Sequence, residues 1–412
     1  MGVLKRWVVG SLAATAVVGA GSTAWAATTI EFWNAYSQSE EDALVKQVLP
    51  LFEKEHPDIH VVARNFSYDQ LRDKLAVGAA AGSGADVARI DIIWSPQFAE
   101  KDLLVPLDKL PGFDATKAKL FPGPLRTNVW RGATYGLPLD TNTQVMLINQ
   151  NVLNQAGVTV PTTLDQWSAA TRHLTQRTSD KTTRWGYALP GPYSWYFLPW
   201  LWSNGGNVTD DAITQATGYL DSTATVGAVE LLKQLYDEGA ISPTAVGGKA
   251  IGTYEGLEQG VYAATQDGPW AVKSIQEKLS GLQQTVFPAG AGGSISVVGG
   301  ENIGIFKTTK SVDASWTFAQ FMLSTEAQTI MAEAGQMPVV KDALRFPGMQ
   351  SLYSAYLQQL LTARPRTVHP TWDRIDGILN KAFKDSMTGQ AAPSSAFASA
   401  AKQVDALLAG GN

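Results

Sequence analysis

Short apolar runs alternate with amphipathic stretches along the chain from residue 27 onward. Strands are predicted at 28–37, 59–66 and 85–94, where apolar and β-branched residues cluster. Between them, apolar residues recur at helical spacing in 39–55 and 67–84, which predicts two helices. This alternation of strand and helix indicates an α/β protein with a mainly parallel sheet whose faces are covered.

The second half of the chain continues this pattern with a larger share of helix. A strand and a helix are predicted within 133–158, and Gly157 ends that helix. Further helices are predicted at 163–178, 223–241 and 313–335, a strand-turn-helix unit at 258–279, and Gly-rich strands at 283–307.

The stretch GPYSWYFLPWLWSNGG (191–206) holds six aromatic residues. It is too short, and too often interrupted by proline, to span a membrane. A helix over 194–204 is predicted instead, ended by the Gly pair. Its helical spacing predicts these core residues: Leu198, Trp200, Leu201 and Trp202. Tyr193 and Trp195, at its N-terminal end, are expected to face a ligand.

Residues 1–26 have the pattern of a signal peptide rather than a membrane anchor. Two basic residues precede an apolar stretch from Trp7 to about Ala20, and Ala24-Trp25-Ala26 supplies the small residues of a cleavage site. The apolar stretch is too short to span a bilayer comfortably. We therefore expect export, cleavage after about Ala26 and a periplasmic mature protein.

Length, charge and cysteine content narrow the classes of function. A chain of 412 residues favours two domains over one core. The net charge of −5 gives no support to nucleic-acid binding, which needs a basic surface. The absence of cysteine excludes disulfides, thiolate metal sites and lipid attachment through an N-terminal Cys. Thirteen Trp residues favour recognition of something flat.

No motif for catalysis or metal binding stands out. The chain contains no G-x-S-x-G, no Walker A loop, no G-x-G-x-x-G after a strand and no H-E-x-x-H, and its four His are scattered. Neither a cofactor nor a metal site is therefore predicted. A carboxylate pair among Asp91, Asp140 and Asp267 leaves open an exported carbohydrate-active hydrolase. A binding protein for another solute, such as a polyamine or a metal chelate, also stays open.

Aromatic and carboxylate residues gather at the C-terminal ends of predicted strands. The segments are EFWNAY, IDIIW, YGLPLDTN, ATQDGPW and VVGGEN. In open parallel sheets these ends line the ligand crevice. Carboxylates and amides can bond sugar hydroxyls, and aromatic faces can cover the C–H faces of a pyranose. The pattern therefore predicts a sugar site.

The same segments, in this order, carry a resemblance to a known family. They include IEFWNAYSQSEEDALVKQVLPLFEKEHPDIHV, IDIIWSPQFAEKDLLVPLD, WLWSNGG, AATQDGPWAV and GGENIGIFKTTKSVDASWTFAQFMLSTEAQ. The chain resembles the carbohydrate-type extracellular solute-binding proteins (family 1) of bacterial ABC importers, in their maltose/trehalose-type branch, over essentially 1–412. The resemblance implies a type II periplasmic binding protein fold: two α/β lobes, each a mainly parallel sheet flanked by helices, with ligand in the cleft between them.

The resemblance also implies three crossings between the lobes. We expect them near 137–139, 285–289 and 308–313. The first lobe is then 27–137 plus 288–310, and the second lobe is 139–285 plus 313–412.

Matching the family's binding positions to this sequence gives the candidate site. With the two residues of the aromatic stretch, the set is Tyr36, Ser39, Glu40, Asp91, Trp94, Gln97, Asp140, Asn142, Tyr193, Trp195, Trp270, Gly299, Gly300, Glu301 and Arg364. Trp270 is expected to be a stacking platform. This branch often has a carboxylate where Asn142 stands, so the pattern of hydroxyl binding is expected to differ there.

The resemblance implies a binding protein without catalysis. It is expected to close on a disaccharide or small oligosaccharide by hinge motion and to present it to the permease subunits of an ABC importer in the inner membrane. We expect a monomer without cofactor. Because the chain has no cysteine, a free periplasmic protein is favoured over a lipid-anchored one.

Export predicts a mature N-terminus at Ala27 or within one residue of it, because Ala24-Trp25-Ala26 forms the cleavage site. N-terminal sequencing of the secreted protein measures this directly. Exported protein that still begins at Met1 would contradict the assignment.

Overall fold

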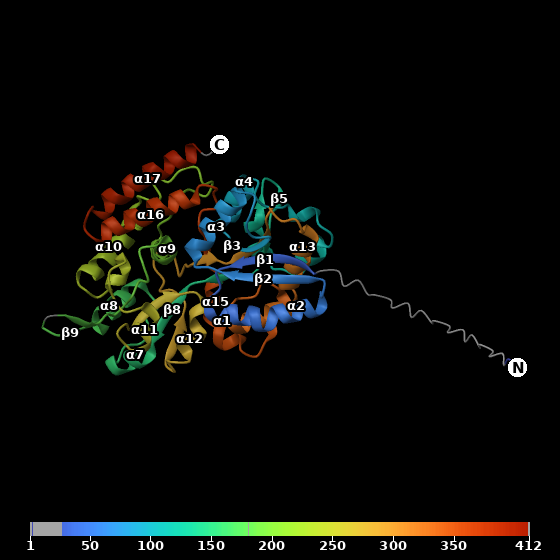
Figure 1. Cartoon of the computed structure of the whole chain (residues 1–412). Coiled ribbons are helices and arrows are strands. Elements are labelled where there is room, and N and C mark those ends of the chain that lie inside the picture. Colours follow the sequence, from blue (N-terminus) through green and yellow to red (C-terminus); the bar gives the residue numbers. More distant parts are fainter. Residues whose placement is uncertain (1, 3–26, 180, 411–412) are drawn as a thin grey trace.

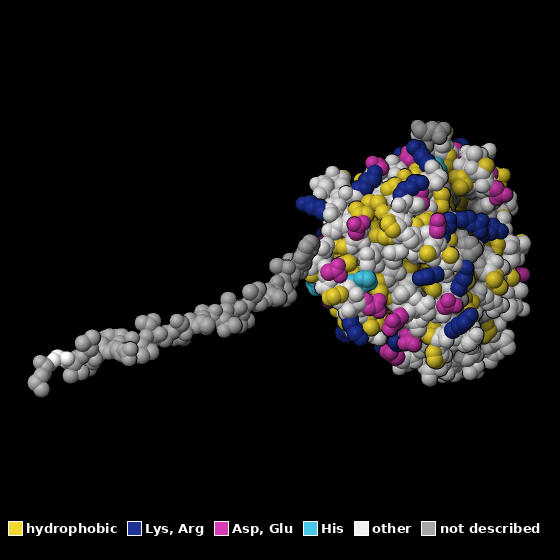
Figure 2. Space-filling model, turned by 90° about the vertical axis from the view of Figure 1, so that its right-hand side faces the viewer, with side chains coloured by type: hydrophobic (Ala, Val, Ile, Leu, Met, Phe, Trp, Pro, Cys, Tyr) yellow, Lys and Arg dark blue, Asp and Glu magenta, His cyan; other side chains and the backbone are white. Residues whose placement is uncertain are grey.

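The computed structural model describes residues 2, 27–179 and 181–410, which form two lobes (Figure 1). The predicted signal peptide lies outside the described residues, apart from Gly2. Among the described residues, no helix combines the length and apolarity needed to cross a bilayer. On the face shown in Figure 2, basic and acidic side chains are interspersed rather than gathered by sign.

The first lobe is built on a five-stranded sheet in the order β2-β1-β3-β14-β6. Its strands are β1 (Thr28–Asn34), β2 (Ile59–Asn65), β3 (Val87–Asp91), β6 (Leu137–Pro138) and β14 (Glu301–Ile305). β1 pairs in parallel with β2 and β3, whereas β14 runs antiparallel to β3 and β6. A strand from late in the chain thus completes a sheet that begins at the N-terminus.

Helices cover this sheet on both faces. They are α1 (Gln38–Ala43), α2 (Leu49–Glu55), α3 (Tyr68–Ala80), α4 (Ser95–Glu100), α5 (Phe113–Ala118), α6 (Pro122–Leu125), α13 (Val312–Met322) and α14 (Thr325–Ala334). A π-helical turn, Leu44–Val48, joins α1 to α2. On one face the ring of Phe318 from α13 packs edge-on against Phe32 and Phe52, with 5.2 Å between centroids in both pairs. On the other face α3 and α4 enclose a smaller core around Ile90.

The second lobe is centred on β8 (Val145–Asn149), which lies between β11 (Ala264–Asp267) and β12 (Leu282–Thr285). Both pairings are antiparallel, which differs from the mainly parallel pairing predicted for this lobe. The reason is that the chain enters the lobe through β8 and turns back along it in β11 and β12. One parallel bridge does join β11 to the segment 185–188, between Thr265 and Ala188.

Smaller strands and a larger set of helices complete the second lobe. The strands are β7 (Asn142–Thr143), β13 (Val297–Gly299) and β15 (Arg364–Pro365), which form one sheet, and the pair β9 (Gln176–Arg177) and β10 (Thr182–Arg184). The helices are α7 (Gln150–Ala156), α8 (Leu164–Leu174), α9 (Ser194–Ser203), α10 (Thr223–Asp237), α11 (Thr253–Glu258), α12 (Val272–Gln276), α15 (Met349–Leu360), α16 (Trp372–Met387) and α17 (Pro393–Ala409).

A separate hairpin, β4 (Val129–Trp130) and β5 (Ala133–Thr134), lies near α4 of the first lobe (Figure 1).

The residues of β8 explain why the second lobe has helices on both sides of its sheet. All five are buried. Met146 and Ile148 belong to the large core that also holds residues of α8, α9, α10, α16 and α17. Val145 and Leu147 belong to another core, with residues of α12 and α15. Because successive side chains of a strand point to opposite faces, an unbroken apolar strand must be covered twice.

The predicted roles within 191–206 are confirmed for the core residues. α9 ends one residue before the predicted position, and Leu198, Trp200, Leu201 and Trp202 are all buried. The ring of Trp200 packs against those of Trp167 (4.2 Å between centroids) and Tyr187 (5.5 Å). These contacts fix α9, and with it the side chains at its first turn.

The lobe boundaries differ from the predicted ones. α13 and α14 pack on the first sheet, whereas the prediction assigns 313–412 to the second lobe. Core membership first changes between Leu139 and Val145, next to the predicted 137–139. The later changes fall within 298–302 and about 335–345, rather than near 285–289 and 308–313. The apolar spacing of 313–335 predicts helices with one face packed on a sheet. It does not say whether that sheet belongs to the first lobe or to the second, because either would bury the same face.

Candidate functional site

One cluster of buried side chains surrounds Arg89, in the middle of β3. An Nη of its guanidinium lies 2.7 Å from Glu301 Oε2, and its Nε lies 3.4 Å from Asp140 Oδ2. The ring of Tyr36 lies over it, with 4.7 Å from the ring centroid to Cζ. The structure thus brings three predicted site residues together around an arginine that the sequence analysis missed. The available signal was a charged residue inside an otherwise apolar strand, VARID.

Glu40 completes this cluster, and the start of α1 fixes its side chain. Ser37 is the N-cap residue, and its backbone N–H donates to Glu40 Oε2 at 2.7 Å in a capping box. Glu40 Oε1 accepts from Gln336 Nε2, and Gln336 Oε1 accepts from Arg89 Nη2 at 3.4 Å. A loop after α14 therefore closes the cluster from the side of the second lobe.

Burial and charge pairing oppose each other around Arg89. Burial raises the pKa of Glu301 and of Glu40, and the nearby guanidinium limits that rise. Burial disfavours the charge on Arg89 itself, but Glu301 and Asp140 raise its pKa above its ordinary value. One cation thus offsets several carboxyl groups that are out of water.

A second buried ion pair joins the two lobes. Arg366 Nη2 lies 3.2 Å from Asp91 Oδ1, and both side chains are more than nine-tenths buried. Asp91 ends β3 of the first lobe, and Arg366 follows β15 of the second. The Tyr68 hydroxyl donates to Asp91 Oδ2 at 2.7 Å, and the backbone N–H of Ile93 donates to Oδ1 at 2.9 Å. Burial disfavours the Arg366 charge, but Asp91 raises its pKa.

Two indoles of the second lobe lie beside this pair. The Arg366 guanidinium lies over the Trp195 ring, 5.2 Å from its centroid, and the centroids of Trp195 and Trp270 are 6.1 Å apart with planes at 31°. A Cβ at Gly299 would come within 2.6 Å of the Trp195 ring, and one at Gly268 within 2.0 Å of the Trp270 ring. The rings therefore lie against backbone that only glycine can supply.

Asp267 is buried next to these indoles, at the end of β11. The Tyr254 hydroxyl and the backbone N–H of Gly268 donate to its carboxylate, and Trp270 Nε1 donates to the Tyr254 hydroxyl at 3.3 Å. Burial raises the pKa of Asp267 to about 6, although these hydrogen bonds lower it. The segment ATQDGPW, which holds Asp267, follows a predicted strand and is one of those that predict the sugar site. Asp267 itself was named only as a possible hydrolase carboxylate.

The remaining predicted residues lie around these clusters. Buried or half-buried are Ser39, Trp94, Gln97, Asn142, Gly299 and Gly300. Trp94 belongs to a first-lobe core, where its ring packs against Tyr68 with 4.6 Å between centroids. Tyr193 precedes α9 and is 57% exposed.

Arg364 does not join the clusters, whereas Arg366, two residues later, does. Arg364 is exposed on β15, where its backbone N–H donates to the Ser296 carbonyl at 2.8 Å. β15 ends at Pro365, so the rule that alternate side chains of a strand share a face cannot be applied to Arg366. The segment ARPRTV offers two arginines, and only the fold tells them apart.

A comparison with protein families identifies the chain. The family model described as bacterial extracellular solute-binding protein matches residues 34–329. The chain belongs to this family.

Relatives of this binding protein match it over most or all of their length. A Brucella abortus (strain 2308) chain named only as a binding protein is 23% identical over 416 residues, which cover 98% of this chain and 99% of that one. The melibiose/raffinose/stachyose-binding protein MelE of Bacillus subtilis (strain 168) is 22% identical over 330 residues, 75% of this chain and 74% of that one. Among solved structures, the GacH receptor of Streptomyces glaucescens GLA.O has a TM-score of 0.84 at 24% identity and covers 94% of this chain and 100% of its own. That similarity concerns the fold.

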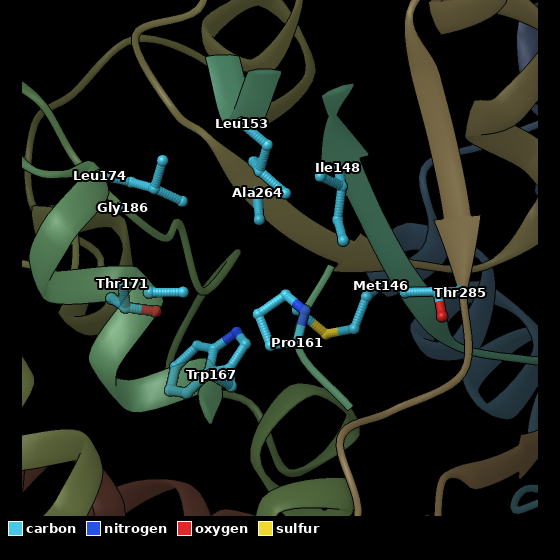
Figure 3. A pocket seen from close by; sticks show the side chains of 11 residues that line it. Met146, Ile148, Leu153, Pro161, Trp167, Thr171, Leu174, Gly186, Ala264 and Thr285 are labelled. Atoms are coloured by element: carbon cyan, nitrogen blue, oxygen red, sulfur yellow. The ribbon is translucent and has the colours of Figure 1, made fainter. Parts of the chain in front are cut away.

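A small cavity lies apart from these clusters, in the core of the binding protein's second lobe (Figure 3). Its volume is about 20 Å³, and Met146, Trp167 and Leu174 are among its mostly apolar lining residues. Such a volume holds about one water molecule and no sugar ring. Within the described residues, no three His, Asp or Glu side chains are grouped to hold a metal ion.

Arg89→Met should destabilise the binding protein by about 3–5 kcal/mol at neutral pH, because it leaves buried carboxyls without their cation. Urea unfolding measures this. A carboxyl whose folded pKa lies above its unfolded value gains stability as pH falls, so the deficit should shrink between about pH 8 and about pH 5. Arg89→Lys keeps the charge and is the control, with a smaller loss expected. A deficit of the same size at every pH would contradict the role given to Arg89.

Proposed function

We propose that this binding protein captures a sugar, a disaccharide or small oligosaccharide, between its lobes and delivers it to an ABC importer. The observation that carries the proposal is that Arg366 lies over the half-buried Trp195 indole, with Trp270 beside it, and pairs with the Asp91 carboxylate of the other lobe. Indole faces suit the C–H faces of a sugar, and carboxylates accept hydrogen bonds from its hydroxyls. Such binding needs no proton transfer, so we propose capture without turnover.

The relatives support a sugar as the ligand. MelE of Bacillus subtilis is named for melibiose, raffinose and stachyose. The GacH receptor was solved unliganded and in complex with acarbose and an acarbose homologue. These ligands contain more than one ring, and two indoles 6.1 Å apart offer more than one face to stack on.

The pair between Asp91 and Arg366 supports closure of the lobes around the ligand. Its partners come from different lobes and lie 3.2 Å apart, so the pair exists only when the lobes approach each other. A sugar that enters between them exchanges part of this pairing for hydroxyl contacts. The closed form then presents both lobes together to the permease subunits.

We propose that the mature protein acts as a monomer in the periplasm. The signal pattern of residues 1–26 and the absence of cysteine support a protein released from the membrane.

Trp270→Ala should weaken sugar binding by about 1–3 kcal/mol, the scale expected for losing a large stacking surface. Calorimetric titration measures the affinity, and thermal unfolding checks that the fold is intact. Trp316→Phe, in the first-lobe core, is the matched control and should leave affinity unchanged. Equal affinities for the wild type and a folded Trp270→Ala variant would remove Trp270 from the site.

Substitutions at Asp91 separate a binder from a hydrolase. An ionised acceptor contributes roughly 1.5–3 kcal/mol per hydrogen bond, so Asp91→Ala should lose much of the affinity. Asp91→Asn keeps the shape and one acceptor oxygen, so it should lose less. The measurement is a titration of all three proteins beside an assay for released sugar over hours.

The two functions give opposite results in this experiment. Saturable binding without products, weakened most in Asp91→Ala, supports the binding protein. Released reducing sugar in the wild type, absent in both variants, would overturn it in favour of the hydrolase.

A further inference from the structure

We propose that Asp267 is a positioning residue that orients the Trp270 indole through the Tyr254 hydroxyl, and that its ionised form is the one competent for sugar binding. The inference rests on the proposed function, because it treats Trp270 as the stacking surface. It adds a residue and a pH dependence that the stacking surface alone does not imply.

The geometry forms a relay of three side chains. Asp267 Oδ2 accepts the Tyr254 hydroxyl hydrogen, and the oxygen of that hydroxyl accepts Trp270 Nε1–H at 3.3 Å. A hydroxyl has a single hydrogen, so donation to Asp267 leaves its lone pairs free for the indole. All three residues belong to the second lobe, on β11, on α11 and in the turn after β11. The relay therefore persists when the lobes move apart.

Close backbone contacts make Trp270 sensitive to this relay. Its ring lies over Gly268, and its Cα lies 3.3 Å from where a Cβ of Gly335 would be. Gly268 thus confines the indole on one side, Gly335 lies against the Trp270 main chain, and the hydrogen bond at Nε1 holds the far edge of the ring. Trp195, whose centroid is 6.1 Å away, shares the surface that a rotation of this ring would change.

Several groups face Asp267, and none of those that act on its carboxyl group is cationic. The donors are Tyr254 of α11, the Gly268 backbone N–H, and the Trp195 and Tyr196 side chains of α9. Further titratable groups nearby are Tyr187, in the segment 185–188, and Tyr356 of α15, whose hydroxyl donates to the Asp267 backbone carbonyl at 3.2 Å. Burial raises the pKa of all four tyrosines, so they stay neutral when Asp267 titrates.

Titration of Asp267 would change the relay chemically. Its pKa of about 6 means that it gains a proton under mildly acidic conditions. The protonated carboxyl can donate to the Tyr254 oxygen, where it competes with Trp270 Nε1–H for the same lone pairs. If only the ionised form binds sugar, a protein one pH unit below the pKa is about one-eleventh competent, and affinity falls about tenfold.

The test follows tryptophan emission and maltose affinity between about pH 5 and about pH 8 in the wild type and four variants. Without sugar, wild-type emission should shift with a midpoint near 6, and Asp267→Asn should lose that shift. Tyr254→Phe and Trp270→Phe should reduce it, leaving the part reported by Trp195, which also faces the carboxyl group. Tyr356→Phe removes a neighbouring hydroxyl that does not touch the carboxylate, and should behave as wild type.

With maltose, wild-type affinity should be about tenfold weaker at pH 5 than at pH 7.5. Asp267→Asn should be weak at both values, with thermal unfolding confirming its fold. An emission shift retained in Asp267→Asn, or undiminished in Trp270→Phe, would overturn the proposal. If maltose does not bind at all, maltose is excluded as the sugar of the proposed function, while the emission titration still decides the relay.

Discussion

Two buried guanidinium groups constrain how the lobes of this protein can meet. Arg89 and Arg366 are each less than one-tenth exposed, and a cation so far from water must find anions nearby. Arg89 finds them on β14 and in the first connection, at Glu301 and Asp140. Arg366 finds Asp91, across the boundary between lobes. The first pairing holds the connecting strands to the first sheet, and the second brings the other lobe onto it.

The two ion-pair groups differ in whether they survive when the lobes separate. The Arg89 cluster lies on the first sheet and its connections, so it can survive an opening movement. The Asp91–Arg366 pair cannot, because opening returns both charges to water, and there the lost attraction is largely recovered as hydration. A ligand with several hydroxyls can offer each charge a partner in place of the other. The pair therefore aligns the two lobes when they are closed and still allows them to separate.

The sequence was sufficient for the fold and for part of the site, and the reasons differ by residue. The apolar run ended by a Gly pair predicted α9 and its core residues, and the helix is buried all round, since every residue from Phe197 to Ser203 is buried. Strand ends pointed to the segments that hold Asp91 and Trp270, since carboxyl ends of strands share one edge of a sheet, and the family resemblance singled out the two residues. Arg89, Arg366 and Tyr254 were missed because each gains its role from a partner distant in the chain. The sheet covered by α13 and the direction of β11 were also beyond local pattern, since both depend on connections between lobes.

The position of β14 has a consequence for how the molecule forms. This strand, residues 301–305, lies between β3 and β6, and without it the first sheet is split. A growing chain therefore cannot complete its N-terminal core until most of the second lobe has been synthesised, and sequential domain-by-domain folding from the N-terminus is unavailable to it. Long-range closure of this kind makes folding slow. A chain that stays unfolded for longer remains a substrate for a secretion channel that threads extended polypeptide.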